Sequence, residues 1–193
     1  MLSLPERFDL LERDLLASPM RISAHSDLPF AILRYEPENE WEMRHHARLL
    51  FNALERANRR AVPISLAEML WQAIDETEGM DAIVSVERDF GFPFAQDAIT
   101  TILSEPDLRP LPETLAGRMA DLDSERDVVF LTRAPAMAPN IYQMSRLLDE
   151  MQGRTRTPAI LFYPGTLEGV VGLRFMGLTN REAMGNYRVK VYG

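Results

Sequence analysis

One segment of the chain, residues 127–163, has the order of elements found in a parallel β-sheet. Asp127–Thr132 (DVVFLT) is a short, continuous apolar run, which is typical of a strand buried inside such a sheet. Apolar residues then recur at helical spacing over residues 139–151, and Gly153 follows as a stop signal. Residues 157–163 (TPAILFY) are again strand-like, and Pro164-Gly165 has the composition of a turn. This order predicts a βαβ unit with a right-handed crossover.

The patterns on either side extend this unit into one α/β domain that spans residues 1–193. Asn39 with Glu42, and Ser65 with Glu68, have the spacing of capping boxes at the starts of two helices. Periodicity predicts helices over residues 5–16, 39–60 and 65–79, two or three short helices over 80–122, and strands over 29–35, 62–64, 171–176 and 187–192. We therefore expect a mixed, mostly parallel sheet flanked by helices, with an acidic helical insertion over about residues 66–125.

Composition restricts the class of protein. The chain has 193 residues, of which 46% are hydrophobic, and this suits a single domain with a buried core. It contains no cysteine, which excludes disulfides, a thiol nucleophile and thiolate metal sites. No apolar run approaches the length of a membrane span, and the N-terminus lacks the pattern of a signal peptide. We expect a cytoplasmic protein.

Charge is distributed unevenly along the chain. The net charge of -8 divides into -1 over residues 1–60, -11 over residues 61–125 and +4 over residues 126–193. An acidic protein does not coat nucleic acid non-specifically, because phosphate binding needs a basic surface. Two faces of opposite sign can instead meet two different partners. Ordinary solvated surface explains the same pattern, and the sequence leaves both interpretations open.

Motifs for catalysis are not found. The GxxxxGK[ST] phosphate loop is absent. Thr132 and Arg133 follow the apolar run Val128–Leu131, at the place where P-loop enzymes carry a magnesium-binding carboxylate. We therefore expect a P-loop-NTPase-like or Rossmann-like core without Walker motifs. The spacing of Gly165, Gly169 and Gly172 does not match GxGxxG. We expect no catalytic residue, no metal site and no cofactor.

The basic C-terminal third is the candidate recognition surface. We assign partner or anion recognition to five residues of this region, namely Arg133, Tyr163, Arg174, Arg188 and Lys190. If the strands over 171–176 and 187–192 are neighbours, Arg174 lines up with Arg188 and Lys190. Solvated arginines at a sheet edge are the alternative, and Tyr163 equally suits the core. Gly165 and Gly172 are interpreted as conformational residues that allow a turn or a close backbone approach.

Three C-terminal segments carry a resemblance to a known family. Residues 161–165 (LFYPG), 172–177 (GLRFMG) and 186–193 (NYRVKVYG) resemble the C-terminal signature of the BrxB family of BREX bacteriophage-exclusion systems. Residues 128–133, 145–151 and 4–8 are also similar to that family, so the likeness extends over essentially the whole chain. Its central helix often has an arginine shortly after a proline, whereas residues 139–143 (PNIYQ) lack one.

The resemblance implies a small cytoplasmic α/β component of phage defence and host-DNA methylation. The implied neighbours are a DNA methyltransferase, a large ATPase and a PglZ alkaline-phosphatase-like protein, with the PglZ-type protein favoured as a direct partner. We expect a non-catalytic adaptor or assembly subunit that meets nucleic acid only indirectly. Two alternatives remain at this point. The first is a degenerate nucleotide-binding domain without hydrolysis, and the second is a DNA-contacting module that uses the C-terminal arginines.

Overall fold

A six-stranded sheet forms the centre of the molecule. The computed structural model describes residues 2–22, 28–168, 172–178 and 189–193. The strands within these residues are β1 (Phe30–Tyr35), β2 (Arg60–Ser65), β3 (Asp127–Thr132), β4 (Ala159–Glu168), β5 (Gly172–Phe175) and β6 (Lys190–Tyr192). Five are parallel in the order β2-β3-β4-β1-β6, and β5 pairs antiparallel with the second half of β4. The predicted mixed, mostly parallel sheet is confirmed.

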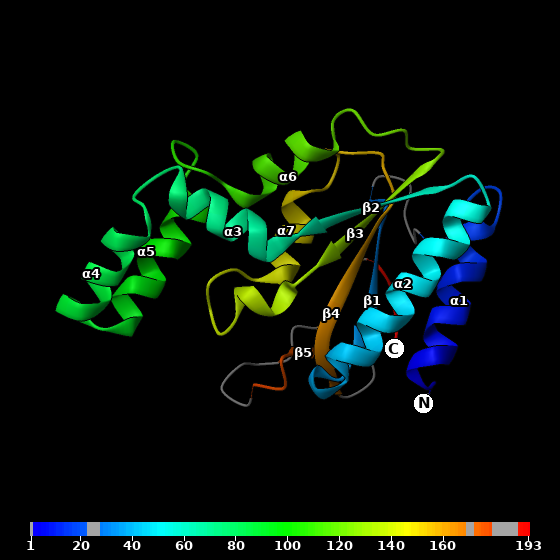
Figure 1. Ribbon diagram of the computed structural model, residues 1–193, viewed down its shortest axis with the longest axis horizontal. Helices are drawn as coiled ribbons and strands as arrows, with labels where there is room; N and C mark the ends of the chain where they lie inside the picture. Colours follow the sequence, from blue (N-terminus) through cyan, green and yellow to red (C-terminus); the bar gives the residue numbers. More distant parts are fainter. Residues whose placement is uncertain (1, 23–27, 169–171, 179–188) are drawn as a thin grey trace.

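Helices cover both faces of this sheet, because its strands are apolar on both sides. On one face lie α1 (Leu4–Leu16) and α2 (Glu40–Arg56), side by side (Figure 1). Phe8, Leu11 and Leu15 of α1 pack there with strand residues such as Leu33 and Phe162. On the other face lie α3 (Leu66–Asp75), α6 (Leu111–Met119) and α7 (Met144–Glu150).

The acidic segment between β2 and β3 is helical. It comprises α3, α4 (Met80–Phe90), α5 (Phe92–Ser104) and α6. Figure 1 shows α4 and α5 as a hairpin that extends away from the sheet. The C-terminal part of α5 is held to the body, where Thr100 Oγ1 donates a 3.0 Å hydrogen bond to the Ile141 carbonyl. The turn between α4 and α5 therefore lies at the free end of the hairpin.

Three local predictions were wrong, each for an identifiable reason. Asn39 does not cap α2, because it belongs to the 3-10 turn η1 (Pro37–Asn39) and lacks the extended backbone that an N-cap uses. The helix predicted from residue 139 begins only at Met144, since residues 138–141 form turns after η2 (Ala134–Met137) and Gln143 has an extended backbone.

The third wrong prediction is the turn at Pro164-Gly165. Strand β4 runs through both residues and ends at Glu168. Gly165 lies opposite Phe175 in the antiparallel pair with β5, and the Pro164 carbonyl accepts the Met176 amide at 2.8 Å. Pairing with β5 satisfies the backbone of this segment, so the chain stays extended where its composition suggested a turn.

Candidate functional site

The carboxyl ends of the parallel strands form the candidate site. From β1 the chain passes through η1 into α2 on one face of the sheet, whereas from β3 it passes through η2 into α7 on the other face. Connections that leave in opposite directions open a crevice at the carboxyl edge, and open α/β sheets bind ligands at such a switch point. The fold alone therefore singles out the ends of β1, β3 and β4.

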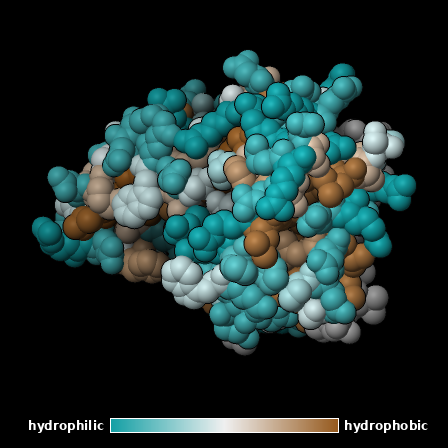
Figure 2. Space-filling view, turned by 45° about the vertical axis from the view of Figure 1, so that its right-hand side comes forward, coloured by the Kyte–Doolittle hydropathy of each residue, from teal (hydrophilic) through white to brown (hydrophobic). Residues whose placement is uncertain are grey.

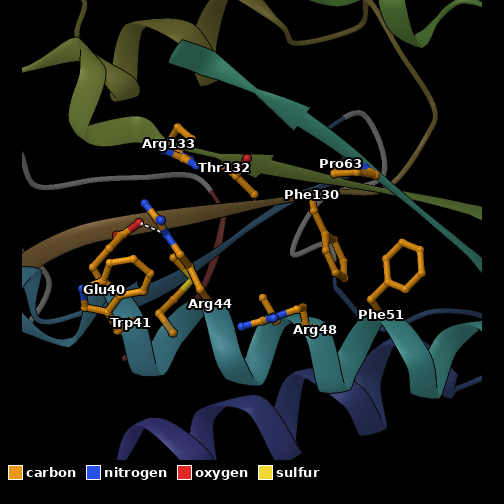
Figure 3. A pocket seen from close by; sticks show the side chains of 11 residues that line it. Glu40, Trp41, Arg44, Arg48, Phe51, Pro63, Phe130, Thr132 and Arg133 are labelled. Carbon is orange, nitrogen blue, oxygen red and sulfur yellow. Dashed lines mark hydrogen bonds and ion pairs between the residues drawn. The ribbon is translucent and has the colours of Figure 1, made fainter. Parts of the chain in front are cut away.

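Two adjoining hollows occupy this place. The first, of about 440 Å³, lies between α2 and the β2–β3 side of the sheet, and we call it the α2 groove. Figure 3 shows side chains of α2 on one side of this groove and those of β2 and β3 on the other. Its lining residues are Glu40, Trp41, Met43, Arg44, Ala47, Arg48, Phe51, Pro63, Phe130, Thr132 and Arg133. The second hollow, of about 340 Å³, shares Glu40, Arg44 and Arg133 with it.

The start of α2 carries an ordered cluster of side chains. Arg44 Nε donates a 2.7 Å hydrogen bond to Glu40 Oε1, and the Tyr35 hydroxyl donates to Glu40 Oε2. The Arg44 guanidinium also lies over the Trp41 ring, 5.1 Å from its centroid. Burial and the Glu40 carboxylate raise the pKa of Tyr35, so its hydroxyl keeps its proton. The Glu40 charge is thus already engaged by two neighbours.

Arg133, predicted as a recognition residue, stands at the mouth of both hollows. It follows β3 directly, is exposed, and has a left-handed backbone with φ of 60°. Such a conformation is uncommon for a residue other than glycine. Across the part of the chain that the structure describes, its side chain makes no hydrogen bond or ion pair. Figure 3 shows it on the opposite side of the groove from Arg44.

Tyr163 lies in the core, which is the alternative that the sequence left open. Only 1% of its surface is exposed, and its ring packs against Phe175 with the centroids 5.3 Å apart. It is therefore not a surface recognition residue. The adjacent Gly165 is closely packed, because a Cβ atom there would overlap the Arg174 carbonyl and lie 2.6 Å from Tyr163 Cε1. Gly172 begins β5 and is buried.

The remaining predicted residues do not form one basic row. Strand β5 pairs with β4 while β6 pairs with β1, so Arg174 and Lys190 lie on strands that are not neighbours. Arg174 Nε donates to Glu168 Oε2 at 3.2 Å, and Lys190 Nζ donates to Asp14 Oδ2 at 2.6 Å. Arg188 lies outside the described residues.

A buried ionic cluster at the end of β1 escaped the sequence reasoning. The Glu36 carboxylate accepts from Arg7 at 3.2 Å and from Arg34 at 2.8 Å, and each arginine is only 2% exposed. Burial opposes ionisation of Glu36, but the hydrogen bonds from Arg7 and Arg34 prevail and hold its pKa below the ordinary value. An arginine inside the apolar run FAILRY was the available signal, because a buried charge requires a partner.

Comparison with models of known protein families identifies the family of this chain. The model of the family described as BREX protein BrxB matches residues 62–191, about two thirds of the sequence. The chain belongs to the BrxB family. It is accordingly a component of a BREX antiviral-defence system. No match is found among curated proteins.

The BrxB match begins within β2 and ends within β6. It includes Arg133, the strand side of the α2 groove and the α4–α5 hairpin. Helix α2, which supplies the other side of the groove, lies before it. The predicted likeness at residues 4–8 also falls outside the matched range, so the match covers less of the chain than the resemblance suggested.

A second surface feature of this BrxB chain is aromatic. Phe90, Phe92 and Phe94 flank the turn between α4 and α5, and 65%, 54% and 59% of their respective surfaces are exposed. We call these three residues the aromatic tip. The rings of Phe90 and Phe94 lie 5.9 Å apart, so they form one patch. Figure 2 shows the hairpin as a lobe with hydrophobic side chains among hydrophilic ones. The sequence FGFPF was the missed signal, since Gly91 and Pro93 place it at a turn.

The described residues give no support for a metal site or for a membrane-spanning helix. In the described portion of the chain, no group of three or more acidic or histidine side chains is placed to hold a metal ion. The helices of that portion are too short or too polar to cross a lipid bilayer.

Proposed function

We propose that this chain acts as a non-catalytic adaptor of its BREX system, and that it binds another BREX protein through the aromatic tip. The aromatic tip carries the proposal. Each of the three phenylalanines is more than half exposed, and contact of their apolar rings with water is unfavourable. Exposed apolar patches of this kind mark protein interaction sites. Aromatic side chains, phenylalanine included, are also enriched at protein interfaces.

The surroundings of the tip indicate the chemistry of the partner. Residues 80–104 contain Asp81, Glu87, Asp89 and Asp97 but only one basic residue, Arg88. A partner with an apolar pocket bordered by basic side chains is complementary to this surface. The PglZ-type protein is our favoured candidate, and the large ATPase and the methyltransferase are the others.

The DNA-contacting alternative is less well supported by the described arginines and lysine. Arg174 and Lys190, which that hypothesis needs free for phosphate, are held by Glu168 and Asp14. Binding of DNA phosphates to these two side chains would first require both ion pairs to break. Counterion release favours DNA binding only where cationic side chains are available to phosphate.

Co-purification tests the adaptor proposal. The tagged chain is co-expressed with the PglZ-type protein, and separately with the ATPase and the methyltransferase. We expect one of them to co-purify stoichiometrically, and the double variant Phe90→Ser/Phe94→Ser to reduce its recovery at least tenfold. Leu49→Ser is the matched control, because Leu49 is 50% exposed on α2, away from the tip.

Three results would contradict the proposal. A chain that elutes alone with every component has no adaptor role. Equal recovery of the partner by the wild type and the double variant places the interface elsewhere. The purified chain is also assayed for hydrolysis of nucleotides and phosphate esters, and turnover that a point substitution abolishes would refute a non-catalytic role.

A further inference from the structure

The α2 groove combines an apolar interior with a cationic rim. Its interior is formed by Met43, Ala47, Phe51, Pro63 and Phe130. Its volume of about 440 Å³ falls within the range of small-molecule sites, roughly 300–1,000 Å³. An apolar hollow of this size, left open to water between α2 and strands β2 and β3, is a feature of a binding site more than of a packing defect.

Two arginines at the rim are available to a ligand. Arg48 projects from α2 and Arg133 from the end of β3, so they approach the groove from separate elements (Figure 3). Both are exposed, and among the residues described here neither makes a hydrogen bond or an ion pair. Arg44 differs, because Glu40 already holds it. The rim therefore offers two uncommitted guanidinium groups, which suit the geometry of phosphate oxygens.

Aromatic groups supply the second half of the site. Phe51 lies on α2 and is partly exposed, whereas Phe130 on β3 is only 3% exposed and packs edge-to-face against Phe162. Figure 3 shows both rings at the same end of the groove, so Phe51 offers a face for stacking and Phe130 forms the apolar floor beside it. Trp41, 78% exposed, stands at the other end. Aromatic side chains bind nucleobases by stacking. A ligand that fits must have a flat apolar part and an anionic part.

The N-terminus of α2 is not the anion site of this groove. Glu40 and Glu42 occupy its first turn, and their carboxylates repel a phosphate there. The cationic side of the groove is instead formed by Arg48, two turns further along α2, and by Arg133 across from it. This arrangement differs from a phosphate loop, in which backbone amides at a helix start hold the phosphates.

We propose that the α2 groove binds a nucleoside phosphate, with the base against Phe51 and Phe130 and the phosphate against Arg48 and Arg133. Free nucleotides and the end of a nucleic acid strand share this chemistry. The proposal does not depend on the aromatic tip, which lies on a different part of the molecule.

Fluorescence of Trp41 provides the test. The chain has two tryptophans, so Trp71→Phe leaves Trp41 as the reporter at the groove. This variant of the full chain is titrated with ATP, AMP, the oligonucleotide (dT)6 and inorganic phosphate. We expect saturable quenching by a nucleotide or by (dT)6, and weaker binding of inorganic phosphate by at least tenfold. The relative Kd of ATP and (dT)6 distinguishes a free nucleotide from a strand end.

Variants at the rim locate the ligand. Arg48→Gln and Arg133→Asn each remove one charge, and asparagine is chosen at 133 because it tolerates the left-handed backbone. We expect each to raise Kd at least tenfold. Arg156→Gln is the control, since Arg156 is exposed and lies outside the groove.

Three outcomes would overturn the proposal. The first is the absence of quenching and of thermal stabilisation by every nucleotide probe at millimolar concentration. The second is binding that Arg48→Gln and Arg133→Asn leave unchanged. The third is saturable quenching by an acidic peptide with no binding of nucleotides, which would make the groove a peptide site. Co-purification through the aromatic tip is measured on the same variants, so failure of either proposal is recognised separately.

Discussion

Asp14 on α1 and Lys190 on β6 are joined by a 2.6 Å contact between Oδ2 and Nζ, although 176 residues separate them in the sequence. The Tyr192 hydroxyl donates to the same oxygen at 2.8 Å, and Lys190 Nζ also donates to the Arg21 carbonyl at 3.1 Å. The last strand is thereby fixed to the first helix. The contacts of Lys190 give it a structural role, which differs from the recognition role predicted from the sequence.

Replacing this carboxylate tests that explanation. Asp14→Asn is expected to lower the free energy of unfolding at pH 7 by about 1.5 kcal/mol, the low end for hydrogen bonds to a charged group, because Lys190 is partly exposed and screened. Urea unfolding monitored by circular dichroism measures the change. Asp9→Asn, an exposed substitution on the same helix, serves as the control and should leave the midpoint unchanged.

The pH dependence of this effect has a definite sign. Burial opposes ionisation of Asp14, but the hydrogen bonds from Lys190 and Tyr192 prevail and hold its pKa below the ordinary value. A carboxyl with a lowered folded-state pKa stabilises the fold above its unfolded-state pKa, and this stabilisation disappears as pH falls through the folded-state value. The difference between wild type and Asp14→Asn should therefore shrink below about pH 4. A difference that stays constant down to pH 2 would exclude the charge as its cause.

Glu36 gives a larger expected effect, because it neutralises two arginines that are each 2% exposed. Glu36→Gln removes the carboxylate that pairs with both buried guanidinium groups, so we expect a loss of about 3 kcal/mol in unfolding free energy at pH 7. The Glu36 pKa is also lowered, and the loss should diminish as pH falls below about 4. Denaturant titrations at several pH values measure it.

Glu38→Gln is the matched control for that experiment. Glu38 is exposed and lies only two residues away in η1. Glu38→Gln removes the same charge from the same turn and should change the free energy of unfolding little. If Glu36→Gln and Glu38→Gln destabilise the protein equally, the buried cluster contributes nothing beyond net charge.

Elements of the fold that depend on local pattern were predictable from the sequence. Apolar runs such as Asp127–Thr132 identify buried strands, because burial on both faces excludes polar side chains. The position of Ser65 before α3 is another case, since its Oγ accepts the Glu68 amide at 3.2 Å as an N-cap does. Both signals lie within a few residues of the structure they specify.

Two features that escaped prediction depend on residues that are distant in sequence. The α2 groove needs Arg48 from a helix and Arg133, 85 positions later, from the residue directly after β3, and no spacing rule connects them. The pairing of β6 with β1, which separates Lys190 from Arg174, is likewise a property of the sheet order. Periodicity identifies elements but does not determine which of them become neighbours.

Gly165 offers the most direct test of the β4–β5 arrangement. A Cβ atom at this position would overlap the Arg174 carbonyl, which is backbone and cannot rotate away. Gly165→Ala should therefore destabilise the protein by about 1–3 kcal/mol, as overpacking does. Gly117→Ala is the matched substitution, because a Cβ at Gly117 in α6 meets no atom within 4 Å. There alanine should stabilise the helix by about 0.5–1 kcal/mol. Opposite signs in parallel urea titrations are the expected result, whereas stabilisation by both substitutions would mean that β5 does not pack against Gly165.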